Sequence, residues 1–166
     1  MNYLKKVKKK KLVLILDNIR SLYNVGAIFR IADGAGIDKI YLGGITGKPP
    51  NEKIKKVALG AEQSVAWEHH WQIWRVVDKL KEENFQIVAL EQTAKSICYT
   101  KFKPKPPLAL IIGNEKRGVS RSLLKRADKI IELPMFGQKE SLNVAIAAGI
   151  AVYEINKYRF NLSKKV

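Results

Sequence analysis

The sequence predicts an α/β fold, with a mostly parallel sheet flanked by helices. Short apolar runs alternate along the chain with amphipathic or alanine-rich stretches of helical periodicity. Two of these runs, at residues 85–90 and 108–112, are apolar almost throughout, which is typical of parallel strands covered on both faces. The 166 residues are enough for one well-buried core, and the chain shows neither an internal repeat nor a second domain.

The expected elements alternate between strand and helix from residue 12 onward. A strand at 12–16 precedes a helix at 25–35, for which Asn24 is placed as an N-cap. A helix expected at 71–83 has an apolar face formed by Trp71, Trp74, Val77 and Leu80. The other expected elements are strands at 39–42, 85–90, 108–112 and 130–133, loops at 46–51 and 101–107, and a helix at 142–158.

The charge of the chain indicates a polyanionic partner. Lysine and arginine number 31 against 15 acidic residues, for a formal net charge of +16. Nucleic acid is the first candidate partner and an anionic membrane surface the second. Residues 1–11 form a lysine-rich tail that is expected to be mobile, and residues 12–160 form the domain.

Other features of the composition limit the class of protein. No apolar run is long enough to cross a bilayer, and the N-terminus lacks the pattern of a cleavable signal peptide, so no membrane partner is expected. Cys98 is the only cysteine, which excludes a disulfide framework and favours a reducing cytoplasm. His69 and His70 are adjacent, whereas helical metal ligands need i, i+4 spacing, so no metal is expected.

Familiar nucleotide motifs are absent. The turn after the first strand does not fit the Gly-x-Gly-x-x-Gly pattern of a dinucleotide site. Residues 113–118 have the glycine spacing of a P-loop, but Val119 and Ser120 follow where a P-loop needs lysine and serine or threonine. Neither phosphate-cradling loop is therefore expected here.

Three segments that each follow an apolar run carry most of the functional information. They are residues 24–30 (NVGAIFR), residues 113–118 (GNEKRG), and residues 133–135 with 141–143 (LPM and SLN). Loops at the carboxyl ends of parallel strands are where α/β sheets bind ligands. In this order and spacing the segments resemble the motifs of the SpoU/TrmH branch of the SPOUT RNA methyltransferases, over residues 12 to 159.

The resemblance implies both a fold and a reaction. It implies a SPOUT fold with a deep C-terminal trefoil knot, a feature otherwise nearly absent from proteins. It also implies methyl transfer from S-adenosylmethionine to a ribose 2′-hydroxyl of RNA. Larger relatives carry an added RNA-binding domain, whereas this chain resembles the minimal members, which favours tRNA over rRNA as the substrate.

Arg30 is one charge in an otherwise apolar stretch. From the residues alone it is either the solvent edge of an amphipathic helix or a functional group. The resemblance implies a catalytic arginine, and a guanidinium suits that role because it can hold a phosphate bidentately and stabilise a developing alkoxide. Asn24 then caps the helix, or orients Arg30 or the ribose, or does both.

Glu115 lies in a glycine-rich turn after the strand at 108–112. It is either a turn acid paired with Lys116 or Arg117, or, by the resemblance, a carboxylate that faces the cofactor and substrate pocket. Gly113 and Gly118 let the backbone approach a ligand closely or adopt positive φ. We expect a bulky side chain at Gly113 to abolish cofactor binding with the fold intact.

The remaining site residues follow the last strand and the strand at 85–90. Ser141 is placed as an N-cap of the final helix. The resemblance adds Ser141 and Asn143 to the catalytic set, with Arg30, Asn24 and Glu115. It also implies a cofactor site made by backbone and side chains of Leu90, Glu91, Thr93, Gly113, Gly118, Leu133, Met135, Ser141 and Leu142.

The final helix is rich in small residues, which permit close helix approach. Between them it presents more apolar surface than one subunit needs, at Leu142, Ile146, Ile150 and Tyr153. These residues are buried either within one subunit or at a dimer contact, and the resemblance favours a homodimer through this helix, with Arg30 serving the partner's site. A non-catalytic RNA-binding protein on the same fold is the alternative function. A basic membrane-surface protein is disfavoured because the strongest helix is alanine-rich rather than basic and amphipathic.

Overall fold

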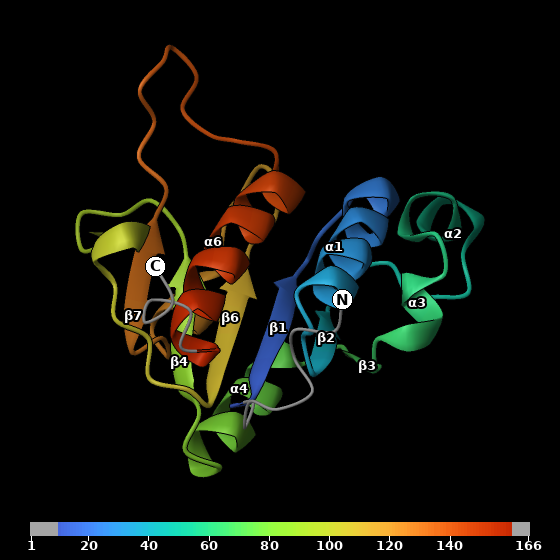
Figure 1. Cartoon of the computed structure of the whole chain (residues 1–166), viewed down its shortest axis with the longest axis horizontal. Helices are drawn as coiled ribbons and strands as arrows, with labels where there is room; N and C mark the ends of the chain where they lie inside the picture. The colour runs from blue at the N-terminus through green and yellow to red at the C-terminus, as the bar shows by residue number, and fades with distance from the viewer. Residues whose placement is uncertain (1–9, 161–166) are drawn as a thin grey trace.

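The structure is a computed structural model that describes residues 10–160, in which seven parallel strands form one sheet (Figure 1). The strands run in the order β3-β2-β1-β6-β4-β7-β5, and every pairing between neighbours is parallel. This confirms the predicted α/β class. The strands are β1 (Leu12–Asp17), β2 (Lys39–Gly43), β3 (Trp67–His70), β4 (Gln86–Leu90), β5 (Ile97–Cys98), β6 (Leu108–Ile112) and β7 (Lys129–Glu132).

Helices cover both faces of this sheet. The helical elements are α1 (Leu22–Gly34), α2 (Glu52–Ala58), α3 (Ala61–Ser64), α4 (Ile73–Glu82), the 3-10 turn η1 (Tyr99–Lys101), α5 (Arg121–Leu124) and α6 (Val144–Arg159). Helices α1 and α6 lie side by side on the face toward the viewer in Figure 1, and α2 and α3 pack beside α1. Helices α4 and α5 pack against the opposite face.

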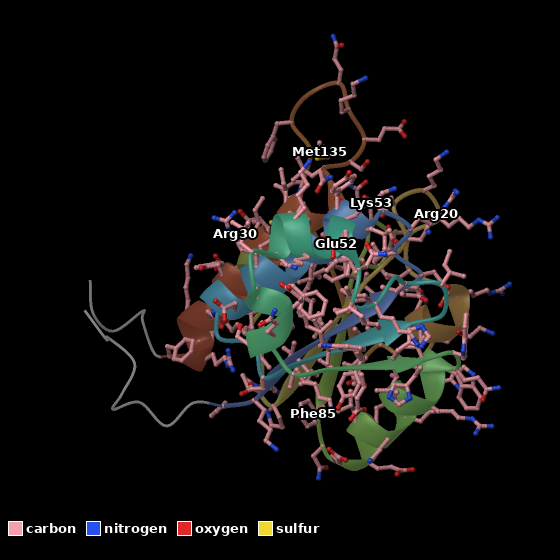
Figure 2. The ribbon with its side chains drawn as sticks, turned by 90° about the vertical axis from the view of Figure 1, so that its right-hand side faces the viewer. Arg20, Arg30, Glu52, Lys53, Phe85 and Met135 are labelled. Atoms are coloured by element: carbon pink, nitrogen blue, oxygen red, sulfur yellow. The ribbon has the colours of Figure 1, made fainter. Side chains whose placement is uncertain are left out.

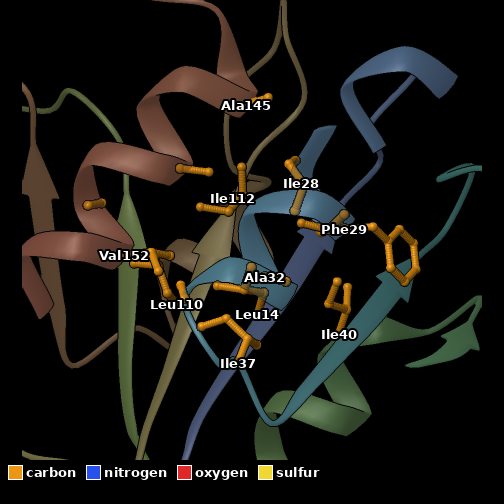
Figure 3. Packing of buried hydrophobic residues seen from close by; sticks show 14 of the residues in the cluster. Leu14, Ile28, Phe29, Ala32, Ile37, Ile40, Leu110, Ile112, Ala145 and Val152 are labelled. Carbon is orange, nitrogen blue, oxygen red and sulfur yellow. The ribbon is translucent and has the colours of Figure 1, made fainter. Parts of the chain in front are cut away.

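The alternation of side chains along β1 explains the two layers. Leu14 points into the core beneath α1 and α6, where it joins Ile28 and Val152 (Figure 3). Ile15 points to the other face and packs with Val77 of α4. Successive strand residues face opposite sides of a sheet, so a strand covered on both faces must be apolar at every position. Each such side chain contributes about 1.5–3 kcal/mol by its burial.

An ion pair anchors the C-terminal end of α6. The Arg159 side chain is fully buried, donates to the carbonyl of Gly36, and pairs with the carboxylate of Asp38. The same carboxylate accepts the backbone N–H of Leu12 at 2.8 Å. The last turn of α6 is thereby fixed to the beginnings of both β1 and β2.

Two predicted N-caps are wrong. Helix α1 begins at Leu22, and its N-cap is Ser21, whose Oγ accepts the backbone N–H of Asn24. Helix α6 begins at Val144, and its N-cap is Asn143 rather than Ser141. In each case the capping side chain lies two or three residues before the N–H groups that it accepts, which moves the helix start away from the predicted residue.

The predicted apolar face of α4 is wrong in part. Trp71 precedes the helix and is 76% exposed, and Trp74 is 36% exposed with its ring against the guanidinium groups of Arg75 and Arg126. The helix starts at Ile73, so Trp71 lies outside it, and Trp74 lies beside its buried stripe. The residues of α4 that are buried are Ile73, Val76, Val77 and Leu80, so Val77 and Leu80 are placed as expected.

Several short helices and strands were not predicted. They are α2, α3, β3, β5, η1 and α5, each of seven residues or fewer. Of the predicted lysine tail, Lys10 and Lys11 are exposed, and residues 1–9 lie outside the described residues. The trefoil knot stays a prediction.

Candidate active site at the carboxyl edge of the sheet

A cavity of about 570 Å³ opens at the carboxyl ends of β4, β6 and β7. Its walls come from the loops that follow these strands, from Asn24 of α1, and from the first turn of α6. The segment between β7 and α6 extends beyond that end of the sheet (Figure 1). Met135, which is labelled in Figure 2, belongs to this segment. The volume lies in the range of small-molecule sites, and the carboxyl edge is where parallel α/β sheets bind ligands.

Glu115 fastens the loop after β6 to the loop after β1. One carboxylate oxygen, Oε2, accepts the backbone N–H of Arg20 at 3.0 Å. The other, Oε1, accepts the backbone N–H of Ser21 at 2.9 Å and the side-chain amide of Asn24 at 3.1 Å. The carboxylate therefore joins the first and second of the three predicted segments. It forms no ion pair with Lys116 or Arg117.

The surroundings of Glu115 favour its ionised form. Partial burial raises the pKa of this carboxyl, but the N–H donors of Arg20 and Ser21, with the Asn24 amide, outweigh burial and hold the pKa below its ordinary value. Glu115 is thus an acceptor-only group at neutral pH. It is suited to positioning the loops and Asn24, and it has no proton to donate.

Asn143 brings in the third segment. Its Oδ1 accepts the backbone N–H of Ala145 at 2.9 Å as the cap of α6, and its Nδ2 donates to Oδ1 of Asn24 at 3.0 Å. Asn24 in turn donates to Glu115. A continuous chain of hydrogen bonds therefore runs from the start of α6 through α1 to the loop after β6.

The two glycines of the second segment have different roles. Gly118 has φ +68°, and a Cβ on it would lie 2.0 Å from Oε2 of Glu91, which accepts the backbone N–H of Val119. A Cβ on Gly113 would lie 2.2 Å from the backbone nitrogen of Val119. Gly113 thus permits close approach of its own loop. The expectation that a bulky side chain at Gly113 leaves the fold intact is wrong, because that side chain would displace backbone.

Comparison with known proteins tests the resemblance of the three segments. The model of the SpoU rRNA Methylase family matches residues 11–153, which is most of the chain. The chain belongs to the SpoU rRNA methylase family. All three segments that build the cavity lie within the matched range.

Individual SpoU relatives agree with this assignment. The tRNA (guanosine(18)-2′-O)-methyltransferase of Aquifex aeolicus is 33% identical over 92% of this chain and 72% of its own length. The 23S rRNA (guanosine-2′-O-)-methyltransferase RlmB of Escherichia coli is 35% identical over 89% of this chain and 60% of its own. This chain spans only about 60–72% of the length of these curated relatives.

Solved structures of SpoU proteins share the fold. The TrmH/SpoU tRNA modifying enzyme of A. aeolicus superposes with a TM-score of 0.84 at 30% identity, covering 93% of this chain and 80% of its own. The SpoU methyltransferase AviRb of Streptomyces viridochromogenes, in complex with AdoMet, gives a TM-score of 0.84 at 25% identity over 94% of this chain and 63% of its own. The parallel architecture of this chain is thus that of the SpoU methyltransferases.

Most of the residues that the SpoU resemblance implied lie around the one cavity. Those expected for the cofactor that line it are Leu90, Glu91, Gly113, Gly118, Leu133, Met135, Ser141 and Leu142. Those expected for catalysis that line it, besides Ser141, are Asn24, Glu115 and Asn143.

Two expected site residues lie elsewhere. Arg30 is exposed on α1, six residues or about 9 Å along the helix from Asn24, and it does not line the cavity. In Figure 2 it lies on the opposite side of the view from Arg20. Thr93 belongs to the turn after β4, where its Oγ1 accepts the backbone N–H of Lys95, and it does not line the cavity.

Several lining residues were missed by reasoning from the sequence. They are Gln92, Asn114, Lys116, Glu132 and Glu140. Asn114 and Lys116 lie within the second segment, so their neighbours gave a usable signal. Glu132 and Glu140 gave none, because a single acid at a strand end or in a loop is common on any protein surface.

The two histidines take part in the packing of the β3 edge. Nε2 of His69 lies 2.8 Å from the carbonyl oxygen of Gly44, and the His69 ring lies edge-on to the ring of Trp71. His70 pairs with Glu68. Within residues 10–160, no group of three His, Cys, Asp or Glu side chains is arranged to hold a metal ion. None of the helices in that range is both long and apolar enough to cross a membrane.

Proposed function

We propose that this protein transfers a methyl group from S-adenosylmethionine to a ribose 2′-hydroxyl of RNA. One observation carries the proposal. The three segments that resemble the family motifs meet at one cavity, joined by the hydrogen bonds from Asn143 to Asn24 and from Asn24 to Glu115. Family membership and the names of the methyltransferase relatives support it.

The cavity fits S-adenosylmethionine. Leu90, Leu133 and Leu142 provide apolar walls for an adenine, beside the backbone of the loops after β6 and β7. Four acids also line the cavity, namely Glu91, Glu115, Glu132 and Glu140, and they suit a ligand with a sulfonium and an ammonium group. When bound, the cofactor supplies an electrophilic methyl group. The protein positions that group and the ribose oxygen that accepts it.

Arg30 serves a second subunit in this proposal. It is exposed and away from its own cavity, and its guanidinium has no hydrogen bond or ion pair with the other residues of 10–160. From a partner subunit, its guanidinium could hold the phosphate beside the target ribose and stabilise the negative charge that develops on the 2′-oxygen as the hydroxyl proton passes to solvent. Asn24 and Asn143 would orient that ribose.

The proposed homodimer uses large apolar side chains of α6 and of the segment before it. Four large apolar side chains are well exposed: Leu142 (41%), Ile146 (57%), Ile150 (37%) and Tyr153 (56%). Their spacing of three or four residues places them along one side of the helix. The small residues Ala145, Ala148 and Ala151 are buried inside the subunit instead. A dimer contact through those alanines is therefore wrong, and the proposed contact keeps only the large apolar side chains that were expected beside them.

The substrate we propose is tRNA, and the proposed place of action is the cytoplasm. The relatives act, by their names, on either tRNA or 23S rRNA, so a test must include both. Purified protein is incubated with methyl-labelled S-adenosylmethionine and either deproteinised tRNA or rRNA, and the modified nucleotide is mapped. We expect label at a ribose 2′-oxygen of tRNA. RNA binding without transfer to either RNA would favour the non-catalytic alternative.

A mixing experiment tests whether Arg30 and the cavity of different subunits cooperate. Arg30→Ala removes the guanidinium, and Ala147→Phe puts a large side chain into the cavity from a lining position outside the apolar stripe. Each variant alone should lose most activity. After subunit exchange, mixed dimers should regain one working site of the two. If exchange is demonstrated and activity does not return, each site is built within a single chain.

A further inference from the structure

The loops after β1 and β6 form a rigid unit beside the cavity. The Asn114 side-chain amide donates to the carbonyl of Asn18 at 2.6 Å, and the backbone N–H of Ser120 donates to Asp17 Oδ2 at 2.7 Å. Asp17 is only 1% exposed, so its bond to Ser120 lies at a buried carboxylate. Together with the bonds from Glu115 to Arg20 and Ser21, these two bonds fix one loop relative to the other.

Three cations project from this unit. Arg20 follows β1, and Lys116 and Arg117 follow β6; all three are exposed. The backbone N–H groups of Lys116 and Arg117 both donate to Oδ1 of Asn114 at 3.0 Å, so the turn that carries them is ordered. The three side chains form neither a hydrogen bond nor an ion pair with any side chain or carbonyl in the described part of the chain.

The nearby acids form no ion pair with these cations. Both oxygens of Glu115 are directed to N–H donors of Arg20, Ser21 and Asn24. Within the cavity, Glu91 accepts the backbone N–H of Val119, and Glu132 accepts the hydroxyl of Ser96. Negative charge therefore lines the cavity, and positive charge lies on its rim. Lys116 is both a rim residue and a lining residue of the cavity.

We propose that Arg20, Lys116 and Arg117 form a phosphate-binding site that holds the RNA backbone next to the nucleotide being methylated. The inference rests on the proposed function and deepens it, because it assigns an RNA contact to the subunit that holds the cofactor. Two guanidinium groups offer planar donor pairs to phosphate oxygens, and the lysine adds a point charge. Because the loops are already ordered, binding costs little backbone entropy.

The carboxylate of S-adenosylmethionine shares the chemistry of a phosphate, and the test separates the two. The variant Arg20→Gln/Lys116→Gln/Arg117→Gln is compared with the wild type and with Arg75→Gln/Lys79→Gln/Lys129→Gln, which removes the same charge from exposed positions away from the cavity rim. RNA affinity is measured between 50 and 300 mM salt. Affinity for S-adenosylhomocysteine and for methylthioadenosine, which lacks the carboxylate, is measured by calorimetry.

Each phosphate contact contributes a slope of about −0.7 to −0.9 in log K against log salt, which is roughly 5- to 8-fold in affinity at 0.1 M salt relative to 1 M. We expect the rim variant to lose roughly two to three such contacts, a slope smaller by about 1.4–2.7. The variant Arg20→Gln/Arg117→Gln, which keeps the cavity-lining Lys116, should have unchanged affinity for both cofactor-type ligands. The control variant should keep a slope close to that of the wild type.

Three results would overturn the proposal. The first is a rim variant with the salt slope and RNA affinity of the wild type. The second is weaker binding of S-adenosylhomocysteine alone, with methylthioadenosine unaffected, which would assign the rim to the cofactor carboxylate. The third is an equal loss of RNA affinity and salt slope in the control variant, which would show that the effect comes from the overall charge of the protein. Failure of the proposed function is separate, because then the wild type itself would transfer no methyl group.

Discussion

The substitution Glu115→Gln isolates the role of one carboxylate with almost no change in shape. In the wild type, Oε1 accepts two hydrogen bonds and Oε2 accepts one. A glutamine oxygen can replace Oε1 toward Ser21 and Asn24. The NH₂ group then faces the backbone N–H of Arg20, so two donors oppose each other and one charge-assisted bond is lost.

Hydrogen bonds to charged groups contribute about 1.5–3 kcal/mol each. The expected loss in unfolding free energy is therefore about 1.5–3 kcal/mol. For a chain of 166 residues, this corresponds to a fall in Tm of roughly 3–12 °C. Methyl transfer should fall further than stability, because Asn24 and the loop after β1 lose their fixed positions.

The pH dependence of Tm identifies the ionised carboxylate as the cause. Because the pKa of Glu115 is lowered in the folded protein, its stabilising contribution is complete above the unfolded pKa of about 4.3, and it is lost as the pH falls through the lowered folded value. The gap in Tm between wild type and Glu115→Gln, followed by circular dichroism, should be constant from neutral pH to about pH 5.5 and close at lower pH. Glu82→Gln, on the exposed side of α4, is the control. Equal Tm values at pH 7, or a gap that persists in acid, would refute the reasoning.

Three other substitutions have distinct readouts. Asp38→Ala leaves the buried Arg159 guanidinium without its carboxylate, and the unfolding free energy measured in urea should fall by about 3–5 kcal/mol. The double variant Asp38→Ala/Arg159→Met should recover part of that free energy, and no recovery would contradict the ion-pair account. Ile146→Glu should give a monomer of low activity by light scattering, and Ile45→Glu, at a similarly exposed site away from α6, should stay dimeric. Asn143→Ser keeps a capping oxygen for α6 but loses the donor to Asn24, so kcat should fall at least 10-fold with little change in Tm. An unchanged kcat would show that the hydrogen-bond chain has no role in catalysis.

The central strands were predictable because their environment leaves few alternatives. β6 occupies the predicted residues 108–112, and all five of its residues are buried between helices on both faces. β3 was missed because its residues, Trp67–His70, are neither alternating nor apolar, as suits a half-covered edge strand. Helix α2 was missed because it buries only Ile54 and Ala58, too short a stripe for a periodic signal.

The same contrast holds at the site. Resemblance identified Asn24, Glu115 and Asn143, and the structure places them in one hydrogen-bond chain. It did not identify two partners of Glu115, the backbone N–H groups of Arg20 and Ser21, because a backbone donor leaves no signature in the sequence. The N-caps were misplaced for a related reason, since several Ser and Asn residues stand near each helix start and local geometry selects among them.

The hydrogen bond between Asn143 and Asn24 joins positions 119 residues apart. Contacts of such long range close late in folding, because the chain entropy of the intervening segment must be lost first. The cavity has no complete wall until α6 has docked on α1, so a chain still emerging from the ribosome cannot yet hold a methyl donor. A ligand that binds only the docked state would in turn favour docking by mass action. Cofactor concentration would thus influence the last stage of the protein's own maturation.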